Sequence, residues 1–276
     1  MRRAVSRPLV ICALALCSAW LQAERLVSID GAITEIVFAL EATENLVGVD
    51  TTSKWPREAE QLPNVGYMRA LSAEGILSLA PDRILTTTDA GPADTLGQLS
   101  RAGVNITIID SQYNLEGVLD KVGAVADALG RPHAGLQLQQ RIQQEVSAAQ
   151  EQLSATVGPL RAMFVMDAGT RGFQVAGQNT RAHGALELAG LTNVFADIRD
   201  YKPLTPEAAI AANPDVILVF HSQENLQSLA RNPALAMTRA AQNGRIHAID
   251  DIDLLAFGPR LGWSLAQLAE RLAEGS

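Results

Sequence analysis

The sequence predicts an α/β protein of two similarly built lobes joined by one long, rigid helix. Residues 71–85 (LSAEGILSLAPDRIL) and 204–218 (LTPEAAIAANPDVIL) repeat one phrase in which Leu, Glu, Pro, Asp, Ile and Leu match in register. Between the two copies, residues 132–155 are rich in Gln, Ala and Glu and hold no proline after the first position, which favours one uninterrupted helix. On both sides of it, strand-like and helix-like segments alternate, as in parallel sheets with crossover helices.

Each copy of the repeat predicts a short helix followed by a strand. Ser72 and Thr205 are hydroxyl residues suited to cap a helix, and a glutamate follows each two positions later. In that position the carboxylates of Glu74 and Glu207 complement the helix dipole, which is the structural interpretation of their presence. Pro-Asp then ends each helix, and a short aliphatic run begins a strand.

The first lobe is expected to cover 24–130 and the second 156–276, each with its own core. In the first lobe we expect strands at 26–30, 46–50 and 104–110 and helices at 33–42, 93–102 and 115–129, besides the repeat. In the second lobe we expect a strand at 161–167, a loop to 180, a helix at 183–189, the repeat, a strand at 244–250 and a helix at 261–274.

The connecting helix is predicted over 131–155. About 22 helical residues span roughly 33 Å, enough to reach from one lobe to the other. A single long helix acts as a stiff strut, unlike a Gly/Ser linker. Gly135 is the one weak position in it.

Residues 1–23 have the pattern of a secretory signal peptide. Three arginines precede an apolar run over 9–20, and Ala23 offers a cleavage point. The run is too short to span a bilayer comfortably, so we expect removal and not anchoring. Both cysteines, Cys12 and Cys17, fall inside this segment, which leaves the expected mature chain without a thiol.

Composition and motifs argue against two classes of function. The formal net charge is −8 and becomes more negative without the arginines of the signal, so nucleic-acid binding is not expected. The sequence has no GxSxG elbow, no phosphate loop and no GxGxxG turn after the first strand, which argues against an enzyme. Asp30 and Asp50 end predicted strands, but aspartates in that position commonly cap the next helix.

Two Rossmann-like lobes, one rigid helix and the duplicated Glu/Pro-Asp phrase resemble the substrate-binding proteins of ATP-binding cassette importers. The resemblance is to the class for haem, cobalamin and siderophores, and it extends over everything after residue 24. It implies a monomeric periplasmic carrier that is not an enzyme and holds its ligand in a cleft between the lobes, beyond the carboxyl ends of the strands. It also implies an inner-membrane permease and ATPase complex as partner, whose arginines Glu74 and Glu207 would meet.

The sequence VGYMR at 65–69 is the sharpest local motif. A phenolate is an oxygen donor suited to ferric iron, and Arg69 stands two residues after Tyr67, where its charge favours loss of the phenol proton. The segment is similar to the haem-binding branch of the class, which implies that Tyr67 ligates haem iron. The structural alternative is a loop tyrosine that packs its ring on a neighbour. Lys54 and Trp55 stand in the preceding loop and are weaker candidates for contact with a propionate or the ring.

The sequence FGPR at 257–260 precedes the final helix. Arginine can hold a carboxylate through two parallel hydrogen bonds, and the resemblance implies that Arg260 contacts haem or its propionate. Phe257 would then lie against the porphyrin face. A turn with an exposed arginine is the structural alternative, and a ferric siderophore or cobalamin is the alternative ligand for the same fold.

His183 is a candidate second axial ligand. It lies in the first turn of a predicted helix in the second lobe, on the side expected to face the cleft. A surface histidine near a helix start is the alternative. The remaining histidines, His133, His221 and His247, share no ligand spacing, so we expect structural or solvated roles for them.

Overall fold

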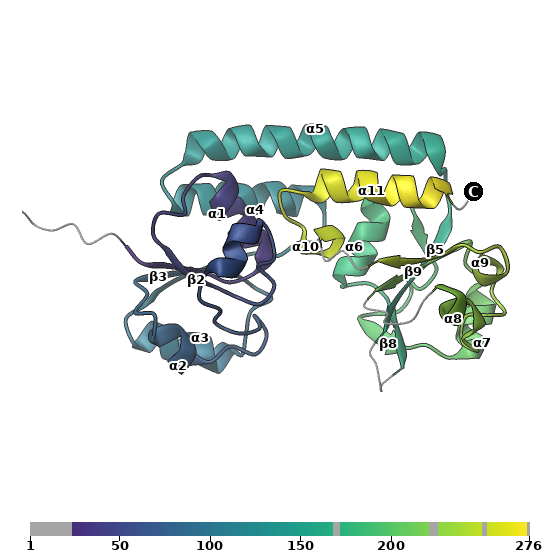
Figure 1. The fold of residues 1–276 in the computed structure, drawn as a ribbon, viewed down its shortest axis with the longest axis horizontal. Helices are drawn as coiled ribbons and strands as arrows, with labels where there is room; N and C mark the ends of the chain where they lie inside the picture. Colours follow the sequence, from purple (N-terminus) through teal and green to yellow (C-terminus); the bar gives the residue numbers. More distant parts are fainter. Residues whose placement is uncertain (1–23, 168–171, 221–225, 250–252, 275–276) are drawn as a thin grey trace, which may run out of the picture.

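The structure, a computed structural model, describes residues 24–167, 172–220, 226–249 and 253–274. It confirms an α/β protein whose two lobes lie side by side beneath one long helix, α5 (Pro132–Thr156) (Figure 1). The predicted signal peptide and His221 lie outside the described residues. In the described ranges, no helix combines the length and the apolarity that crossing a bilayer requires.

The first lobe is a four-stranded parallel sheet with helices on both faces, in the order β2-β1-β3-β4. Side chains of α1 and α4 cover one face, and those of α2 and α3 cover the other, so apolar side chains of its strands are buried on both faces. The elements are β1 (Leu26–Ser28), α1 (Gly31–Ala39), β2 (Leu46–Val49), the 3₁₀-helix η1 (Arg57–Gln61), α2 (Ala73–Leu77), β3 (Arg83–Thr87), α3 (Ala93–Arg101), β4 (Asn105–Ile109) and α4 (Leu115–Ala128).

The second lobe is built on a six-stranded sheet in the order β10-β9-β5-β6-β8, with β7 beside β5. Its elements are β5 (Arg161–Asp167), β6 (Phe173–Ala176), α6 (Arg181–Leu188), β7 (Thr192–Asn193), β8 (Tyr201–Pro203), α7 (Pro206–Ala212), β9 (Val216–Phe220), α8 (Leu226–Arg231), α9 (Arg239–Gln242), β10 (Ile246–Ile249), α10 (Asp253–Ala256) and α11 (Leu261–Glu274).

This second sheet is mixed, where a parallel sheet was expected. β5, β9 and β10 run parallel, but β6 runs antiparallel to both β5 and β8. The few residues between β5 and β6 are too short for the crossover that a parallel pair needs, so the chain returns antiparallel. β6 lies inside the segment that we expected to be a loop up to residue 180. This strand was not predicted because its four residues carry little periodicity.

The two repeat copies form the expected helix–strand units, α2–β3 and α7–β9. Thr205 caps α7, since its hydroxyl accepts a hydrogen bond from the backbone N–H of Ala208 at 3.2 Å. Ser72 holds the same position at α2, but within the described structure its side chain makes no capping hydrogen bond. The expected hydroxyl cap is therefore confirmed in the second copy and wrong in the first.

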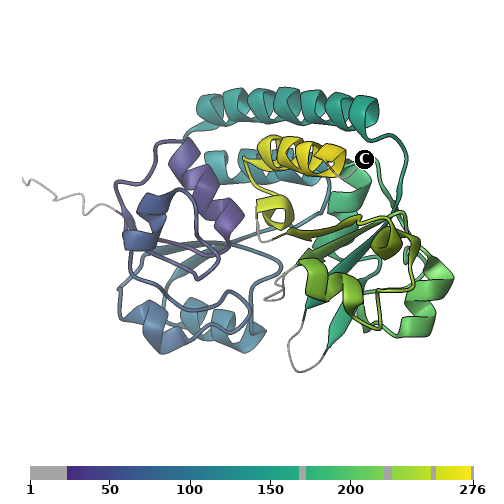
Figure 2. The ribbon, with the colours of Figure 1, turned by 45° about the vertical axis from the view of Figure 1, so that its right-hand side comes forward.

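The two lobes share one apolar core, which corrects the expectation of separate cores. A continuous buried cluster runs from Ile33 and Val122 in the first lobe to Leu186 and Leu265 in the second. Helix α5 joins the two parts because its buried side chains, Ile142 among them, recur every three or four residues along one face. Each sheet has one smaller apolar cluster on its opposite face. Figure 2 shows α5 extended above both lobes.

Close helix contacts fix α5 to each lobe. A Cβ atom added to Gly135 of α5 would collide with the Cβ of Ala126 on α4. A Cβ added to Gly262 of α11 would collide with Glu145 on α5. The glycine that weakens the predicted helix thus lets α5 approach the first lobe, and a second glycine does the same for the second lobe.

Candidate functional site

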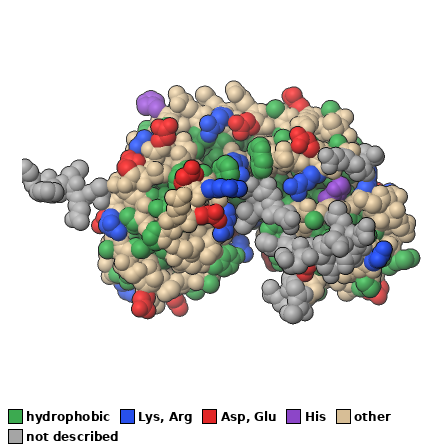
Figure 3. Space-filling view, viewed as in Figure 1, with side chains coloured by type: hydrophobic (Ala, Val, Ile, Leu, Met, Phe, Trp, Pro, Cys, Tyr) green, Lys and Arg blue, Asp and Glu red, His purple; other side chains and the backbone are tan. Residues whose placement is uncertain are grey.

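A pocket of about 640 Å³ lies between the two lobes. This volume falls within the roughly 300–1,000 Å³ that is usual for small-molecule sites. The first lobe contributes Lys54, Trp55, Tyr67 and Arg69 to its lining, and the second contributes Met166, Arg181, Tyr201 and Phe220. Figure 3 shows acidic and basic side chains gathered where the two lobes meet. The pocket therefore combines apolar and aromatic walls with several charged groups.

Tyr67 reaches the pocket because of the local structure of its loop. Val65 and Met68 are buried in the first lobe, which leaves the phenol of Tyr67 47% exposed on the pocket side. Gly66 has a φ of 95°, a left-handed conformation that only glycine adopts without strain. Its N–H donates to Oδ1 of Asn64 at 2.8 Å, which fixes the turn. The structure thus places Tyr67 as a projecting phenol on one wall.

Three other predicted residues, Arg69, Lys54 and Trp55, lie in the lining of the same pocket. Lys54 also forms a 3.2 Å ion pair with Glu60, and both side chains are well exposed, so water screens this pair. The structure therefore brings four of the predicted side chains, all from the first lobe, to one pocket.

Arg260 lies in a neighbouring pocket of about 800 Å³, outside the lining of the interlobe pocket. Its guanidinium carbon is 4.3 Å from the centre of the Trp55 ring and 5.6 Å from that of Trp263, and it forms a 3.3 Å ion pair with Glu35. Trp55 lines both pockets.

Phe257 is fully buried in the shared core and is absent from the pocket lining. Its ring centre lies 5.6 Å from that of Tyr113, in a tilted arrangement. This placement does not support the predicted contact between Phe257 and a ligand ring. The aromatic side chain fills the contact between the lobes instead.

The structure does not bring His183 to the pocket that Tyr67 lines. Its Nδ1 lies 3.2 Å from Nδ2 of Asn193, and its Nε2 lies 3.4 Å from Oε1 of Glu187. Both ring nitrogens therefore have neighbours within the second lobe. In the described part of the chain, no group of three or more His, Cys, Asp or Glu side chains forms a metal site.

Glu74 and Glu207 are exposed on α2 and α7, one on each lobe. Each stands three residues before an exposed aliphatic side chain, Leu77 in the first copy and Ile210 in the second. The repeat thus presents the same pair of surface residues, one acidic and one apolar, on both lobes.

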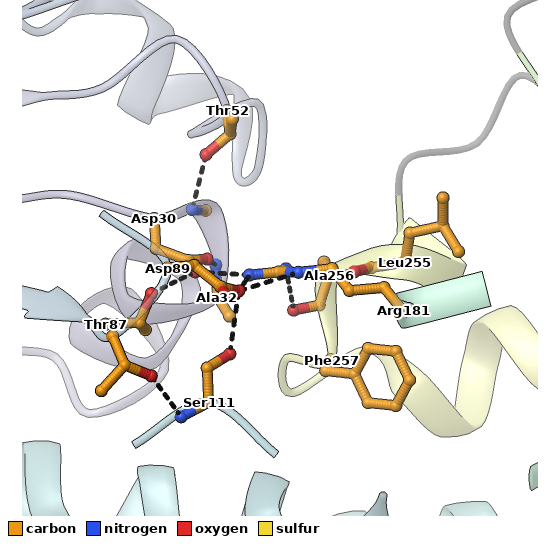
Figure 4. Close-up of polar contacts among 12 residues, drawn as sticks. Asp30, Ala32, Thr52, Thr87, Asp89, Ser111, Arg181, Leu255, Ala256 and Phe257 are labelled. Atoms are coloured by element: carbon orange, nitrogen blue, oxygen red, sulfur yellow. Dashed lines mark hydrogen bonds and ion pairs between the residues drawn. The ribbon is translucent and has the colours of Figure 1, made fainter. Parts of the chain in front are cut away.

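Sequence reasoning missed a polar cluster of four residues, three of which, Asp30, Tyr113 and Arg181, line the pocket. This Arg181 cluster consists of Asp30, Asp89, Tyr113 and Arg181, of which Figure 4 labels the three charged members. Its acidic members follow strands β1 and β3, and Arg181 follows the capping residue of α6. The only available signal was that Asp30 ends a strand, and the helix-capping role expected for it is confirmed by its 2.9 Å bond from the N–H of Ala32.

Electrostatics within the cluster keep its carboxylates ionised. Burial by itself raises the pKa of Asp30 and that of Asp89, but the positive charge of Arg181 and the hydrogen bonds that each carboxylate accepts together outweigh it, so both pKa values lie below the ordinary range. Burial, together with a hydrogen bond to Asp89, raises the pKa of Tyr113. Burial also raises the pKa of Tyr201, to about 12.

Two α/β lobes, a rigid connecting helix and a pocket lined by both lobes define the class of bilobal solute-binding proteins. The family model for periplasmic binding proteins matches residues 26–252, and the chain belongs to this family. Its members are solute-binding proteins and not enzymes, as predicted.

Similar proteins narrow the class further. The haem-binding protein RhuT from Roseiflexus sp. RS-1, solved without ligand, is 41% identical with a TM-score of 0.85, and the match covers 91% of this chain and 98% of that one. BhuT, solved with two haems, is 39% identical with a TM-score of 0.86 and the same coverage. The vitamin B12-binding protein of Yersinia pestis (strain Pestoides F) is 26% identical over 213 residues, which is 75% of this chain and 73% of that protein.

Proposed function

We propose that this chain is a periplasmic carrier that binds ferric haem between its lobes through Tyr67 and delivers it to an inner-membrane ATP-binding cassette permease. The observation that carries the proposal is the half-exposed phenol of Tyr67 on the wall of the interlobe pocket. Haem-binding proteins at 39–41% identity with the same fold support it. Tyrosinate is an established axial ligand of haem iron.

The choice of Tyr67 follows from comparing the three tyrosines of the sequence. Burial raises the pKa of Tyr201 to about 12, and burial and the neighbouring Asp89 raise that of Tyr113. Both phenols are therefore held in the protonated form, which is a poor ligand for ferric iron. Tyr67 is the most exposed of the three and has Arg69 two residues away.

The rest of the pocket fits a flat apolar ring with two carboxylates. Met166 and Phe220 offer apolar surface from the second lobe, and Arg69 and Lys54 offer cations from the first. We assign the propionate contacts to these two cations. Arg260 lies outside the lining of this pocket and packs on Trp55, which lines it.

For delivery, we propose that Glu74 and Glu207 contact basic residues of the permease. One exposed carboxylate on each lobe suits a partner made of two similar halves. Leu77 and Ile210 add a matched apolar contact three residues further along. A double Glu74→Ala/Glu207→Ala variant is expected to bind haem normally and to lose delivery to the permease in reconstituted vesicles.

Absorbance titration of the mature protein with hemin tests the proposal. The wild type is expected to bind hemin with a high-spin ferric spectrum, and Tyr67→Phe is expected to lose that spectrum and to bind at least tenfold more weakly. Tyr201→Phe is the matched control, since it removes a phenol from the opposite wall of the same pocket and should keep the spectrum. Equal binding by Tyr67→Phe and wild type would contradict the assignment.

Cobalamin is the second candidate ligand, because vitamin B12-binding proteins are among the relatives. A ferric siderophore remains a further alternative for the same fold. Parallel titrations with cyanocobalamin and with ferric siderophores decide between them and haem. Saturable binding of cobalamin without binding of hemin would replace the proposed ligand and leave the carrier function intact.

A further inference from the structure

The Arg181 cluster joins the two lobes beside the pocket (Figure 4). Nη2 of Arg181 lies 2.9 Å from Oδ2 of Asp30 and 2.6 Å from Oδ2 of Asp89, and Nε donates to the same Asp89 oxygen at 3.2 Å. Both carboxylates belong to the first lobe, whereas Arg181 begins α6 of the second. One guanidinium therefore connects the lobes through two carboxylates.

The remaining donors of Arg181 fix its orientation. Nη1 donates to the backbone carbonyl oxygens of Leu255 at 3.1 Å and Ala256 at 3.2 Å. The ring of Tyr113 lies 5.5 Å from the guanidinium carbon. Only 16% of the Arg181 side chain is exposed, so its ion pairs are screened less than those on the surface. A planar guanidinium held on three sides has one geometry available.

The carboxylates are held just as firmly in the first lobe. Oδ2 of Asp30 accepts a hydrogen bond from the Thr87 hydroxyl at 2.9 Å, and its Oδ1 accepts one from the N–H of Ala32 at the same distance. Asp30 has a φ of 96°, a left-handed conformation that a non-glycine residue keeps only where its surroundings enforce it. Asp89 accepts from the hydroxyl of Ser111 at 3.2 Å. Neither acid is free to follow Arg181 if the lobes move apart.

A second hydrogen bond between the lobes lies close by. Nζ of Lys121, a fully buried side chain of α4, donates to the carbonyl oxygen of Phe257 at 3.1 Å. A Cβ atom at Gly184 of α6 would collide with the carbonyl of Tyr113, so α6 lies directly against the first lobe. The lobes are thus in fixed contact on this side of the pocket.

We propose that Arg181 is a positioning residue for ligand binding, because its ion pairs to Asp30 and Asp89 set the separation between the Tyr67 wall and the Tyr201 wall. Arg181 lines the pocket, but its charge is already compensated by two carboxylates, so the role assigned to it is to hold the geometry. The inference rests on the proposed function for the identity of the ligand. The separation of the walls is a property of the protein alone and is measured without ligand.

Removal of Arg181 breaks the ion pairs that join the lobes. It leaves the buried Asp30 and the partly buried Asp89 without that partner, and hydration of these carboxylates favours a wider separation of the lobes. Spin labels at Asp94→Cys and Met237→Cys report on this, because both sites are exposed, one lies in each lobe, and the expected mature chain has no other cysteine. Electron–electron distance measurements are expected to give one narrow distribution for this pair. Adding Arg181→Gln should broaden it and lengthen its mean.

The matched control is Arg239→Gln. It removes an arginine that forms a 2.7 Å ion pair with Asp215 inside the second lobe, so the distance distribution should stay as in the labelled parent. Dissociation of hemin, followed by its transfer to apomyoglobin, should be at least tenfold faster for Arg181→Gln, with the ferric spectrum retained. Arg181→Lys, which keeps the charge, should restore part of this loss.

An unchanged distance distribution in folded Arg181→Gln overturns the inference, whatever the hemin result. If Arg181→Gln does not fold, Asp89→Asn replaces it, since this variant keeps the pair between Arg181 and Asp30. It should give a smaller broadening, and an unchanged distribution overturns the inference equally. Failure of the wild type to bind hemin contradicts the proposed function instead and leaves the distance measurement to decide on Arg181.

Discussion

Arg260 of the second lobe stacks on Trp55 of the first, with its guanidinium carbon 4.3 Å from the centre of the indole ring. Trp55 lines the interlobe pocket and also the neighbouring one that holds Arg260. A cation over an indole contributes about 0.5–1 kcal/mol at a partly exposed site. The stacked pair of Arg260 and Trp55 is therefore a contact between the two lobes and not a feature of either alone.

Replacing Trp55 should connect the two pockets. We expect Trp55→Ala to weaken hemin binding about tenfold, which corresponds to about 1.4 kcal/mol, because the pocket loses an aromatic wall. Trp263→Ala removes the other indole beside Arg260, which does not line the interlobe pocket, and should leave the affinity unchanged. Hemin titration of both variants checks this, and equal losses would show that Trp55 has no separate role.

The contact between α5 and α4 predicts a steric effect at Gly135. We expect Gly135→Ala to lower the free energy of unfolding by about 1–3 kcal/mol, because the added methyl group collides with Ala126. Gly75→Ala is the control: its Cβ would lie 3.9 Å from its nearest neighbour, the Cβ of Ser72, so it should stabilise α2 slightly. Urea unfolding of both variants measures the difference.

The two repeat copies predict different responses to loss of a hydroxyl. Thr205→Ala should lower the free energy of unfolding by about 1 kcal/mol, because Thr205 caps α7 through the N–H of Ala208. Ser72→Ala should have a much smaller effect, since the Ser72 hydroxyl makes no capping bond in the described structure. Urea unfolding of the pair is its own control, and equal losses would mean that Ser72 also caps its helix in solution.

The Arg181 cluster predicts loss of stability in acid. The folded-state pKa values of Asp30 and Asp89 lie below their ordinary value of 3.8, so the unfolded chain binds more protons near that pH. Their stabilising effect is fully present above the ordinary value and is lost as the pH falls through the folded values. The free energy of unfolding should therefore decrease as the pH falls below about 5, and less steeply in Asp89→Asn.

Asp50 provides a contrast of opposite sign. Burial raises its pKa, so its contribution to stability is present at low pH and is lost as the pH rises through the folded value. Asp50→Asn should therefore not reduce the acid dependence of the wild type. A flattened pH profile in Asp50→Asn, measured by urea unfolding, would contradict the assignment of acid loss to the Arg181 cluster.

Elements with a long periodic pattern were predictable from the sequence. The helix at 132–155 and the strand at 161–167 agree with α5 and β5 within one residue at each end. The short strands β6, β7 and β8 were missed because two to four residues carry no readable period. The repeat predicted one unit in each lobe, and both are present.

The site was predictable only where its residues share one loop. Tyr67 and Arg69 lie in one short segment, so the motif and the pocket coincide. Arg181 and its acids come from three separate segments, and no local pattern links them. Phe257 was expected at the ligand because the sequence does not reveal the backbone conformation of its loop. In the structure Phe257 has a φ of 54°, and its ring is fully buried.

The apolar cluster beneath α5 determines how the protein unfolds. Because the same buried side chains serve both halves, neither half retains a complete interior when it is severed from the other. Heating should accordingly melt the described chain in a single cooperative transition, with equal calorimetric and van't Hoff enthalpies, despite its two-lobed outline.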